Sequence, residues 1–168
     1  MRTSYTSFPS NSKVWVFQSS RLLTESDFET IKKYTDTFLE NWDSHGKIVK
    51  SDYTILHNLF LVFFVDEEGD RLCGSAPGKL IRVIKELEQD LQIELMNRMN
   101  LAYLNNGQTQ VVQMNDFTKL IQDGKVDAST TVFDNTVSTK ELFDTKWQSA
   151  LKDSWLIVTG KQIGRAHV

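Results

Sequence analysis

The chain has little of the residue types that build metal centres and disulfides. Cys73 is its one cysteine, so the chain cannot form an intrachain disulfide or supply the paired thiolates of a structural zinc site. The three histidines, His45, His57 and His167, do not follow the spacing of a metal-binding motif. We therefore expect no metal centre and no disulfide framework, and the sequence indicates no cofactor.

A basic excess and long apolar segments are lacking too. The formal net charge is −3, whereas general nucleic-acid binders carry a basic excess, so we expect no nucleic-acid partner. The longest apolar run, from Leu59 to Val65, is far shorter than the roughly 20 residues needed to cross a bilayer. The first residues also lack the apolar core of a signal peptide. These features favour a cytoplasmic protein that does not insert into membranes.

What the chain does contain is material for one hydrophobic core. Its 168 residues are 40% hydrophobic and include ten Phe and four Trp, which fits a single domain. We expect an N-terminal arm over residues 1–12, one domain over 13–157 and a tail over 158–168. Residues 163–168 resemble the in-frame translation of a common sequencing-adapter sequence, so no function is drawn from them.

Two long helices are expected in the first half of the chain. Thr24, followed three positions later by Asp27, resembles a capping box and predicts a helix start. Apolar residues then recur at helical spacing as far as Trp42, and Gly46 is expected to end this helix. Pro77 suits the first turn of a second helix.

Strand patterns alternate with helical ones. Residues 13–18 and 131–133 are rich in β-branched and aromatic side chains, and 53–66 predicts one strand, or two with a break near His57. Because 59–65 shows no polar alternation, we expect a central strand buried on both faces. Asn106-Gly107 predicts a hairpin turn. With two further short helices, one capped by Asn115 and one opened by a capping box over 138–141, the order predicts an α+β fold. We expect one compact domain, a mainly antiparallel sheet with about four helices packed on it.

The segment Trp42-Asp43-Ser44-His45-Gly46 is the first candidate site. It combines a titratable ring with a large aromatic side chain where a helix is expected to end, and such loops often carry function. The candidate binding surface consists of Trp42, His45, Gly46, Asp153, Ser154 and Trp155, which would meet if the end of the domain folds back. No catalytic residue is assigned. The structural alternative is that His45 hydrogen-bonds the helix end or its own loop.

A second region of interest precedes the second helix. The run from Gly74 to Leu80 resembles a phosphate-binding loop, but its glycines are one residue too close and Leu80 replaces the required hydroxyl. We interpret it as the entrance of a helix. Cys73 lies beside this entrance, where a helix dipole can lower the pKa of a thiol. The alternative is that Cys73 is an inert packing residue.

Several segments spread over residues 8–155 together carry a family resemblance. They are Val14–Gln18, Trp42 with His45-Gly46, Ile81-Arg82 with Glu86–Glu88, Asp90-Leu91 with Met99-Asn100, residues 131–140 and Asp153–Trp155. In these pieces the chain resembles a small, uncharacterised bacterial family, common in Bacteroidota, whose members are labelled "ABC transporter ATPase". The resemblance implies ATP hydrolysis and association with a transporter.

Two classes of function follow from these patterns. No recognised catalytic constellation occurs, and aromatic residues gather at the ends of expected elements, where they can anchor a partner. The leading hypothesis is a non-enzymatic domain that binds an unknown protein or small molecule. The alternatives are an enzyme of unrecognised mechanism that uses His45, and the nucleotide-binding or transporter-associated ATPase-like protein implied by the resemblance. A concave pocket lined by His45, Trp42 and residues 153–155 would favour the enzyme.

Overall fold

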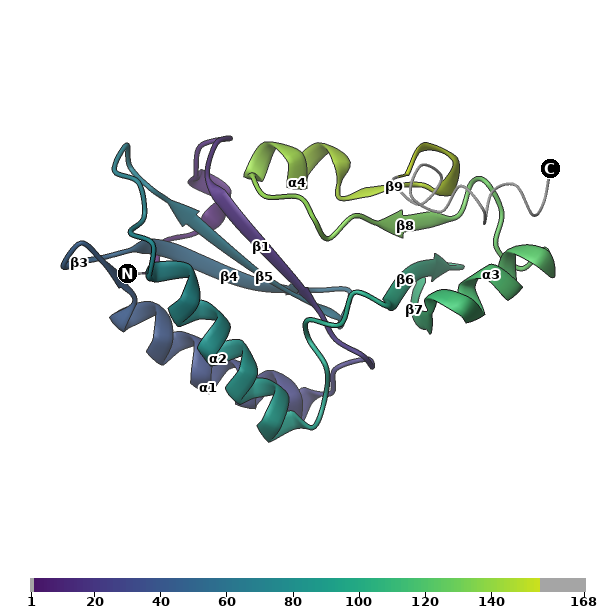
Figure 1. Ribbon diagram of the computed structural model, residues 1–168, viewed down its shortest axis with the longest axis horizontal. Coiled ribbons are helices and arrows are strands. Elements are labelled where there is room, and N and C mark those ends of the chain that lie inside the picture. The colour runs from purple at the N-terminus through teal and green to yellow at the C-terminus, as the bar shows by residue number, and fades with distance from the viewer. Residues whose placement is uncertain (1, 155–168) are drawn as a thin grey trace.

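The computed structural model describes residues 2–154 and shows an α+β fold with antiparallel sheets and four α-helices. The first sheet has three strands in the order β1-β5-β4 (Figure 1); they are β1 (Lys13–Gln18), β4 (Lys50–Leu56) and β5 (Phe60–Asp66). All residues from Phe60 to Val65 have 0% exposure, so the expected central strand buried on both faces is confirmed. Consecutive side chains of β5 point to opposite faces, and each face needs its own cover.

Two long helices cover one face of this sheet, α1 (Glu25–Asn41) and α2 (Ala76–Leu91). The capping box at the start of α1 is confirmed: Thr24 and Asp27 each accept a hydrogen bond from the other's backbone N–H. Pro77 lies in the first turn of α2, as expected. The core between these helices and the sheet contains Ile31, Leu39, Leu61, Phe63, Val65, Leu80, Ile84 and Leu87.

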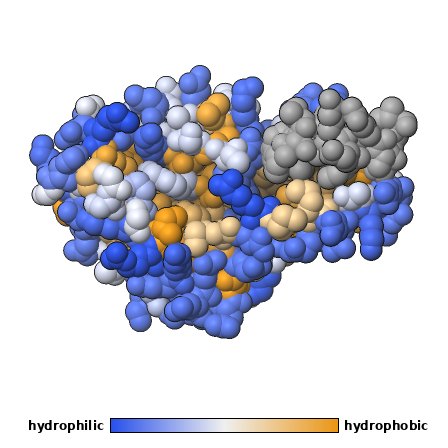
Figure 2. Space-filling view, in the orientation of Figure 1, coloured by the Kyte–Doolittle hydropathy of each residue, from blue (hydrophilic) through white to orange (hydrophobic). Residues whose placement is uncertain are grey.

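A second layer covers the opposite face. It is a four-stranded antiparallel sheet in the order β7-β6-β8-β9, formed by β6 (Asn100–Asn105), β7 (Gln108–Gln113), β8 (Thr131–Phe133) and β9 (Gln148–Ala150). The helices α3 (Met114–Gln122) and α4 (Lys140–Lys146) complete this layer. Between the two sheets lies a core that includes Phe60, Val62, Phe64, Ala102, Phe133 and Trp147. Figure 2 shows mostly hydrophilic residues on the viewed face, with hydrophobic residues reaching the surface between α2 and α4.

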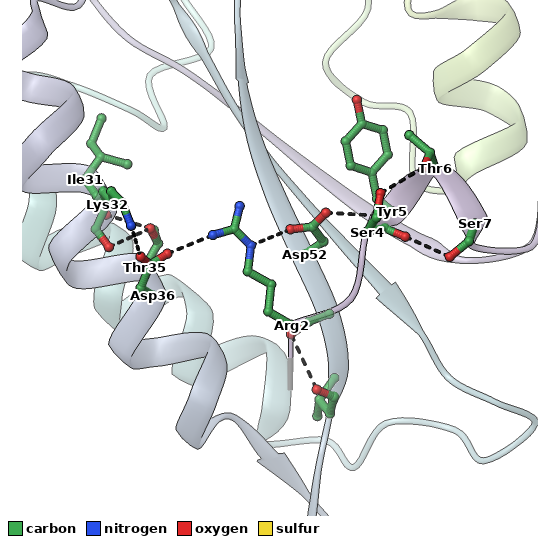
Figure 3. A network of polar contacts seen from close by, with 12 residues as sticks. Arg2, Ser4, Tyr5, Thr6, Ser7, Ile31, Lys32, Thr35, Asp36 and Asp52 are labelled. Atoms are coloured by element: carbon green, nitrogen blue, oxygen red, sulfur yellow. Dashed lines mark hydrogen bonds and ion pairs between the residues drawn. The ribbon is translucent and has the colours of Figure 1, made fainter.

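The N-terminal segment is bound to the edge of the first sheet by hydrogen bonds. The Arg2 guanidinium donates to Asp52 at 2.8 Å and to Asp36 at 3.0 Å, so it joins β4 to α1 (Figure 3). The backbone N–H of Tyr5 donates to the other oxygen of Asp52 at 2.9 Å, and the Tyr5 ring stacks on Phe64. A short 3-10 helix, η1 (Tyr5–Ser7), follows. The arm therefore covers a strand edge.

The predicted end of the first helix is wrong. The helix ends at Asn41, and Gly46 lies in a hairpin turn between β2 (Asp43–Ser44) and β3 (Lys47–Ile48). His45 and Gly46 have φ values of 53° and 76°, the left-handed pair that a two-residue turn requires. Trp42 therefore lies outside the helix. The indole N–H of Trp42 donates to the carbonyl of Ala76 at 2.9 Å, which ties this residue to the start of α2.

Two smaller differences concern helix caps. The third helix begins at Met114, one residue before the expected cap Asn115. In the fourth helix Thr139 alone forms the side-chain cap, by accepting from the N–H of Leu142. The alternative of two strands with a break near His57 is confirmed, since His57 lies in the turn between β4 and β5 at φ 54°.

Candidate functional site

Polar groups from two segments of the chain gather around Cys73. The β2–β3 hairpin lies against the loop that leads into α2, and the backbone N–H of Cys73 donates to Ser44 Oγ at 2.7 Å. Cys73 Sγ lies 3.3 Å from Ser75 Oγ. We call Ser44, His45, Cys73 and Ser75 the hairpin site.

The hairpin site stabilises the charged form of the Cys73 thiol. The Ser75 hydroxyl, then the Ser44 hydroxyl and the backbone N–H of His45, hydrogen-bond the sulfur and lower the pKa of Cys73 to about 6. A thiol with this pKa is mainly a thiolate at neutral pH, the form that acts as nucleophile and as soft ligand. Because Cys73 is only half-buried, the sulfur can be reached by a ligand.

His45 takes part in this site through its backbone. Its imidazole Nε2 lies 3.1 Å from the backbone carbonyl of Arg71. The contact is structural, but it joins the ring to the loop before α2, and not to the helix end or to the loop of His45 itself, as the structural alternative had it. The backbone N–H of His45, held in the hairpin turn, is what faces the Cys73 sulfur.

Trp42 anchors the β2–β3 hairpin to the core. It is 1% exposed, packs edge-on to Trp15 and against Phe38, and holds the start of α2 through its bond to Ala76. A buried tryptophan with a satisfied N–H acts here as a core residue. It fixes the hairpin relative to α2 and offers almost no surface to a ligand.

The loop that resembles a phosphate site is a helix entrance, as interpreted from its spacing. Gly74 lies in a turn, and Gly78 is part of α2. The Lys79 ammonium forms an ion pair with Asp43 of the hairpin at 2.6 Å. Lys79 thus helps to hold the hairpin on α2.

The candidate binding surface divides into two places. Trp42, His45 and Gly46 lie together at the hairpin, whereas Asp153 and Ser154 follow β9, which lies at the opposite end of the molecule from β3 (Figure 1). The Ser154 hydroxyl donates to the carbonyl of Leu151, a core residue of the second layer. Trp155 lies outside the described residues. The structure does not bring residues 153 and 154 to His45.

Sequence reasoning noticed Cys73 but missed the groups that surround it. Ser44 reaches it from 29 positions earlier in the chain, and no motif relates the two residues. The one available signal was the neighbouring Ser75 at the helix entrance. Finding Ser44 requires knowing that residues 43–48 fold into a hairpin and that Trp42 anchors it.

Hydrogen bonds within the loop engage the acidic turn after β5: Asp66 accepts from the N–H of Glu68, and Glu67 accepts from the N–H of Leu72. Within residues 2–154 no group of three His, Cys, Asp or Glu side chains is arranged to hold a metal ion. Over the same residues, no helix combines the length and the apolar character needed to cross a bilayer.

A shallow pocket of about 730 Å³ lies at the far end of α2. It is lined by Ser20, Lys85, Glu88, Gln89, Gln92, Ile93 and Glu94. Its carboxylates are engaged with the surrounding chain: Glu88 accepts from the N–H of Leu95, and Glu94 accepts from Asn97 and Asn100. The pocket is open, and its lining is about as polar as it is apolar, unlike the mostly apolar clefts that usually hold small molecules.

Comparison with known proteins adds no relative. No match was found among protein-family models, curated proteins or solved structures. The resemblance to the Bacteroidota family stays a hypothesis, and the functional argument rests on the hairpin site.

Proposed function

We propose that this protein is a cytoplasmic binding domain that engages a small molecule or a partner protein at the hairpin site, through the Cys73 thiolate. The observation that supports it is that two separate segments hold Cys73: Ser44 of the β2–β3 hairpin accepts from its backbone N–H, and Ser75 at the entrance of α2 lies in hydrogen-bond distance of its half-buried sulfur. Accessible cysteines of low pKa are the ones that react with soft electrophiles and disulfides.

The chemistry of such binding is thiol–disulfide exchange. The Cys73 thiolate attacks one sulfur of a ligand disulfide, a new sulfur–sulfur bond forms, and the other sulfur leaves as a thiolate. No external oxidant is needed, because the ligand disulfide supplies the oxidising equivalents. The donors that hold the Cys73 anion before the reaction also keep its sulfur a good leaving group when a thiol reverses the step. Binding at this site is therefore reversible.

The first test measures the pH dependence of Cys73 reactivity. The rate of reaction with a small aromatic disulfide should rise with a midpoint near pH 6, which is the pKa of the thiol. Ser75→Ala removes the strongest hydrogen bond, so its midpoint should move upward. Ser129→Ala, at an exposed serine bonded to Asp127, is the matched control and should leave the midpoint unchanged. A midpoint at the ordinary thiol value of about 8.5 in the unsubstituted protein would refute the proposal.

The second test looks for the ligand itself. Thermal unfolding is followed with disulfides, metabolites, metal ions and ATP with magnesium, for the natural chain and for Cys73→Ser. A ligand present at a hundred times its dissociation constant adds about 2.7 kcal/mol of stability, which is easily detected. We expect a ligand whose stabilisation disappears in Cys73→Ser. A ligand that stabilises both chains equally binds elsewhere and contradicts a site centred on the thiol.

The second candidate function is an enzyme that uses His45. It is favoured by the position of the His45 ring in the same hairpin as the donors to Cys73, on a residue held at φ 53°. His45→Asn keeps a side chain that tolerates this backbone conformation and removes the titratable ring. Unchanged thiol reactivity and ligand binding in His45→Asn support the binding domain. Loss of turnover of a ligand found in the screen, with binding retained, would support the enzyme.

A further inference from the structure

The β2–β3 hairpin is held against the entrance of α2 by polar contacts. Three consecutive residues of the hairpin each contact the segment over 71–79, and the pairs are Asp43 with Lys79, Ser44 with Cys73 and His45 with Arg71. The distances between their polar atoms are 2.6, 2.7 and 3.1 Å, in that order. Hydrogen bonds and one ion pair therefore place the hairpin beside Cys73.

The hairpin buries little of its own surface. Of residues 43–48, Ser44 alone is buried, and the four residues after it are exposed. Segments with few buried apolar groups need little free energy to open locally. The base of the hairpin is different, because Trp42 and Val49 are buried and the N–H of Val49 donates to the carbonyl of Trp42 at 2.8 Å. Residues 43–48 can therefore move together about this base.

The ion pair between Lys79 and Asp43 is accessible to solvent. The side chains of Lys79 and Asp43 are 34% and 45% exposed, so water and salt weaken their attraction. The hydrogen bond from the Lys79 ammonium, followed by its charge, lowers the pKa of the Asp43 carboxyl. The docked hairpin thus favours the ionised pair and, by linkage, the ionised pair favours docking.

We propose that the β2–β3 hairpin docks on the α2 entrance and detaches from it, and that the ion pair between Asp43 and Lys79 sets the balance between the two states. The motion regulates the hairpin site, so this inference rests on the proposed function. In the docked state Ser44 accepts from the backbone N–H of Cys73. In the detached state only Ser75 stays beside the sulfur, because it belongs to the same segment as Cys73.

Detachment of the hairpin changes the chemistry of Cys73. The pKa of the thiol is lowered first by Ser75 of its own segment and then by two groups of the hairpin, the Ser44 hydroxyl and the backbone N–H of His45. When the hairpin leaves, the pKa of the thiol returns toward its ordinary value, and less of it is thiolate at neutral pH. A charged partner that competes for either member of the ion pair therefore reduces the reactivity of the sulfur without touching it.

Hydrogen exchange of the Cys73 backbone N–H, followed by NMR, tests this motion, because that N–H donates to Ser44 only while the hairpin is docked. Each rate is divided by that of an unstructured peptide in the same buffer. Asp43→Asn removes the charge of the ion pair, so the rate should rise about twofold to fivefold. In the unsubstituted chain the rate should also rise as salt is added to about 1 M, whereas in Asp43→Asn it should not. Asp144→Asn, which breaks an exposed ion pair with Lys140 on α4, is the matched control and should leave the rate unchanged.

A second measurement separates this proposal from the proposed function. The pH midpoint of Cys73 reactivity should be higher in Asp43→Asn than in the unsubstituted chain, and unchanged in Asp144→Asn. An exchange rate that responds neither to Asp43→Asn nor to salt overturns the proposed motion, even where a midpoint near pH 6 supports the reactive thiol. A midpoint that stays in place while the exchange rate rises overturns the regulation of the thiol by the hairpin. An ordinary thiol midpoint in the unsubstituted chain, with exchange that responds to Asp43→Asn, refutes the proposed function and supports the motion of the hairpin.

Discussion

Asp27 joins the start of α1 to the loop before it. Its carboxylate accepts from the backbone N–H of Thr24 at 2.8 Å and from the Arg21 guanidinium at 2.6 Å. The hydrogen bond from Arg21, followed by those from Thr24, lowers the pKa of Asp27 to about 2 although the carboxyl is largely buried. The folded structure therefore stabilises the ionised form of the Asp27 carboxyl relative to the protonated form.

Asp27→Asn should lower the free energy of unfolding by about 1–2 kcal/mol at pH 7. The pKa of Asp27 is lower in the folded chain than its unfolded value of about 3.9, so its contribution is complete above that value and is lost as the pH falls through about 2. Urea unfolding at pH 7 and at pH 2 measures this. The gap between the two chains should shrink at pH 2, and a gap of equal size at both values would contradict the assignment.

The hairpin site shows which residue roles a sequence can reveal. Cys73 and the helix entrance are neighbours in the sequence, which suggested a thiol pKa lowered by the helix dipole; in the structure, hydrogen bonds from Ser75, Ser44 and the backbone of His45 lower the pKa of Cys73. The role of Ser44 could not be predicted, because a serine in an expected helix end has no reason to contact a residue 29 positions later. His45 attracted attention for its ring, yet its backbone N–H is the group that faces the sulfur.

At the scale of elements, strong local patterns predicted the structure well. The apolar run of β5, the capping box of α1 and the Asn106-Gly107 turn each carry their own physical cause, which tertiary contacts did not override. The β2–β3 hairpin could not be predicted. Its strands have two residues each, too few for a hydrophobic period, and its position depends on the tertiary bond from Trp42 to Ala76.

The N-terminal arm offers a test of how one element is held. Arg2→Met removes the cation beside Asp52, whose side chain is 9% exposed, and leaves that carboxylate with the N–H of Tyr5. We expect a loss of about 1–2 kcal/mol in the free energy of unfolding, because a largely buried carboxylate loses a charged partner.

Lys32→Met is the matched control for Arg2→Met. It breaks an exposed ion pair with Asp36 on α1, which should change stability by less than about 0.5 kcal/mol. Both variants are compared by urea unfolding. Equal losses in the two would mean that the Arg2 contact contributes no more than an ordinary surface ion pair.

At the scale of the whole molecule, the two layers share one aromatic junction. Trp147 is 3% exposed and lies about 5 Å from the rings of Phe60 and Phe133, and its indole N–H donates to Asn135. Phe60 belongs to the first sheet and Phe133 to the second. The junction therefore couples the two layers.

Trp147→Ala should cost about 3–5 kcal/mol and should lower the stability of both layers together. Denaturant unfolding followed by circular dichroism and by hydrogen exchange of β5 and β6 amides measures the effect in each layer. We expect one shared transition at lower denaturant concentration. Separate transitions, with the first sheet and its helices unaffected, would show that the layers unfold independently.

The burial of β5 on both faces also has a consequence for the chain while it is being made. Helices α1 and α2 can cover one face of the first sheet early, since both lie within residues 25–91. The other face is different, because Phe60 packs against Phe133 and Trp147, and Trp147 leaves the ribosome about 80 residues after β5. At roughly 5–20 residues per second, Phe60 waits roughly 4–16 s for this cover in every round of synthesis. A nascent chain of this protein thus presents a chaperone with a defined apolar surface for a defined time.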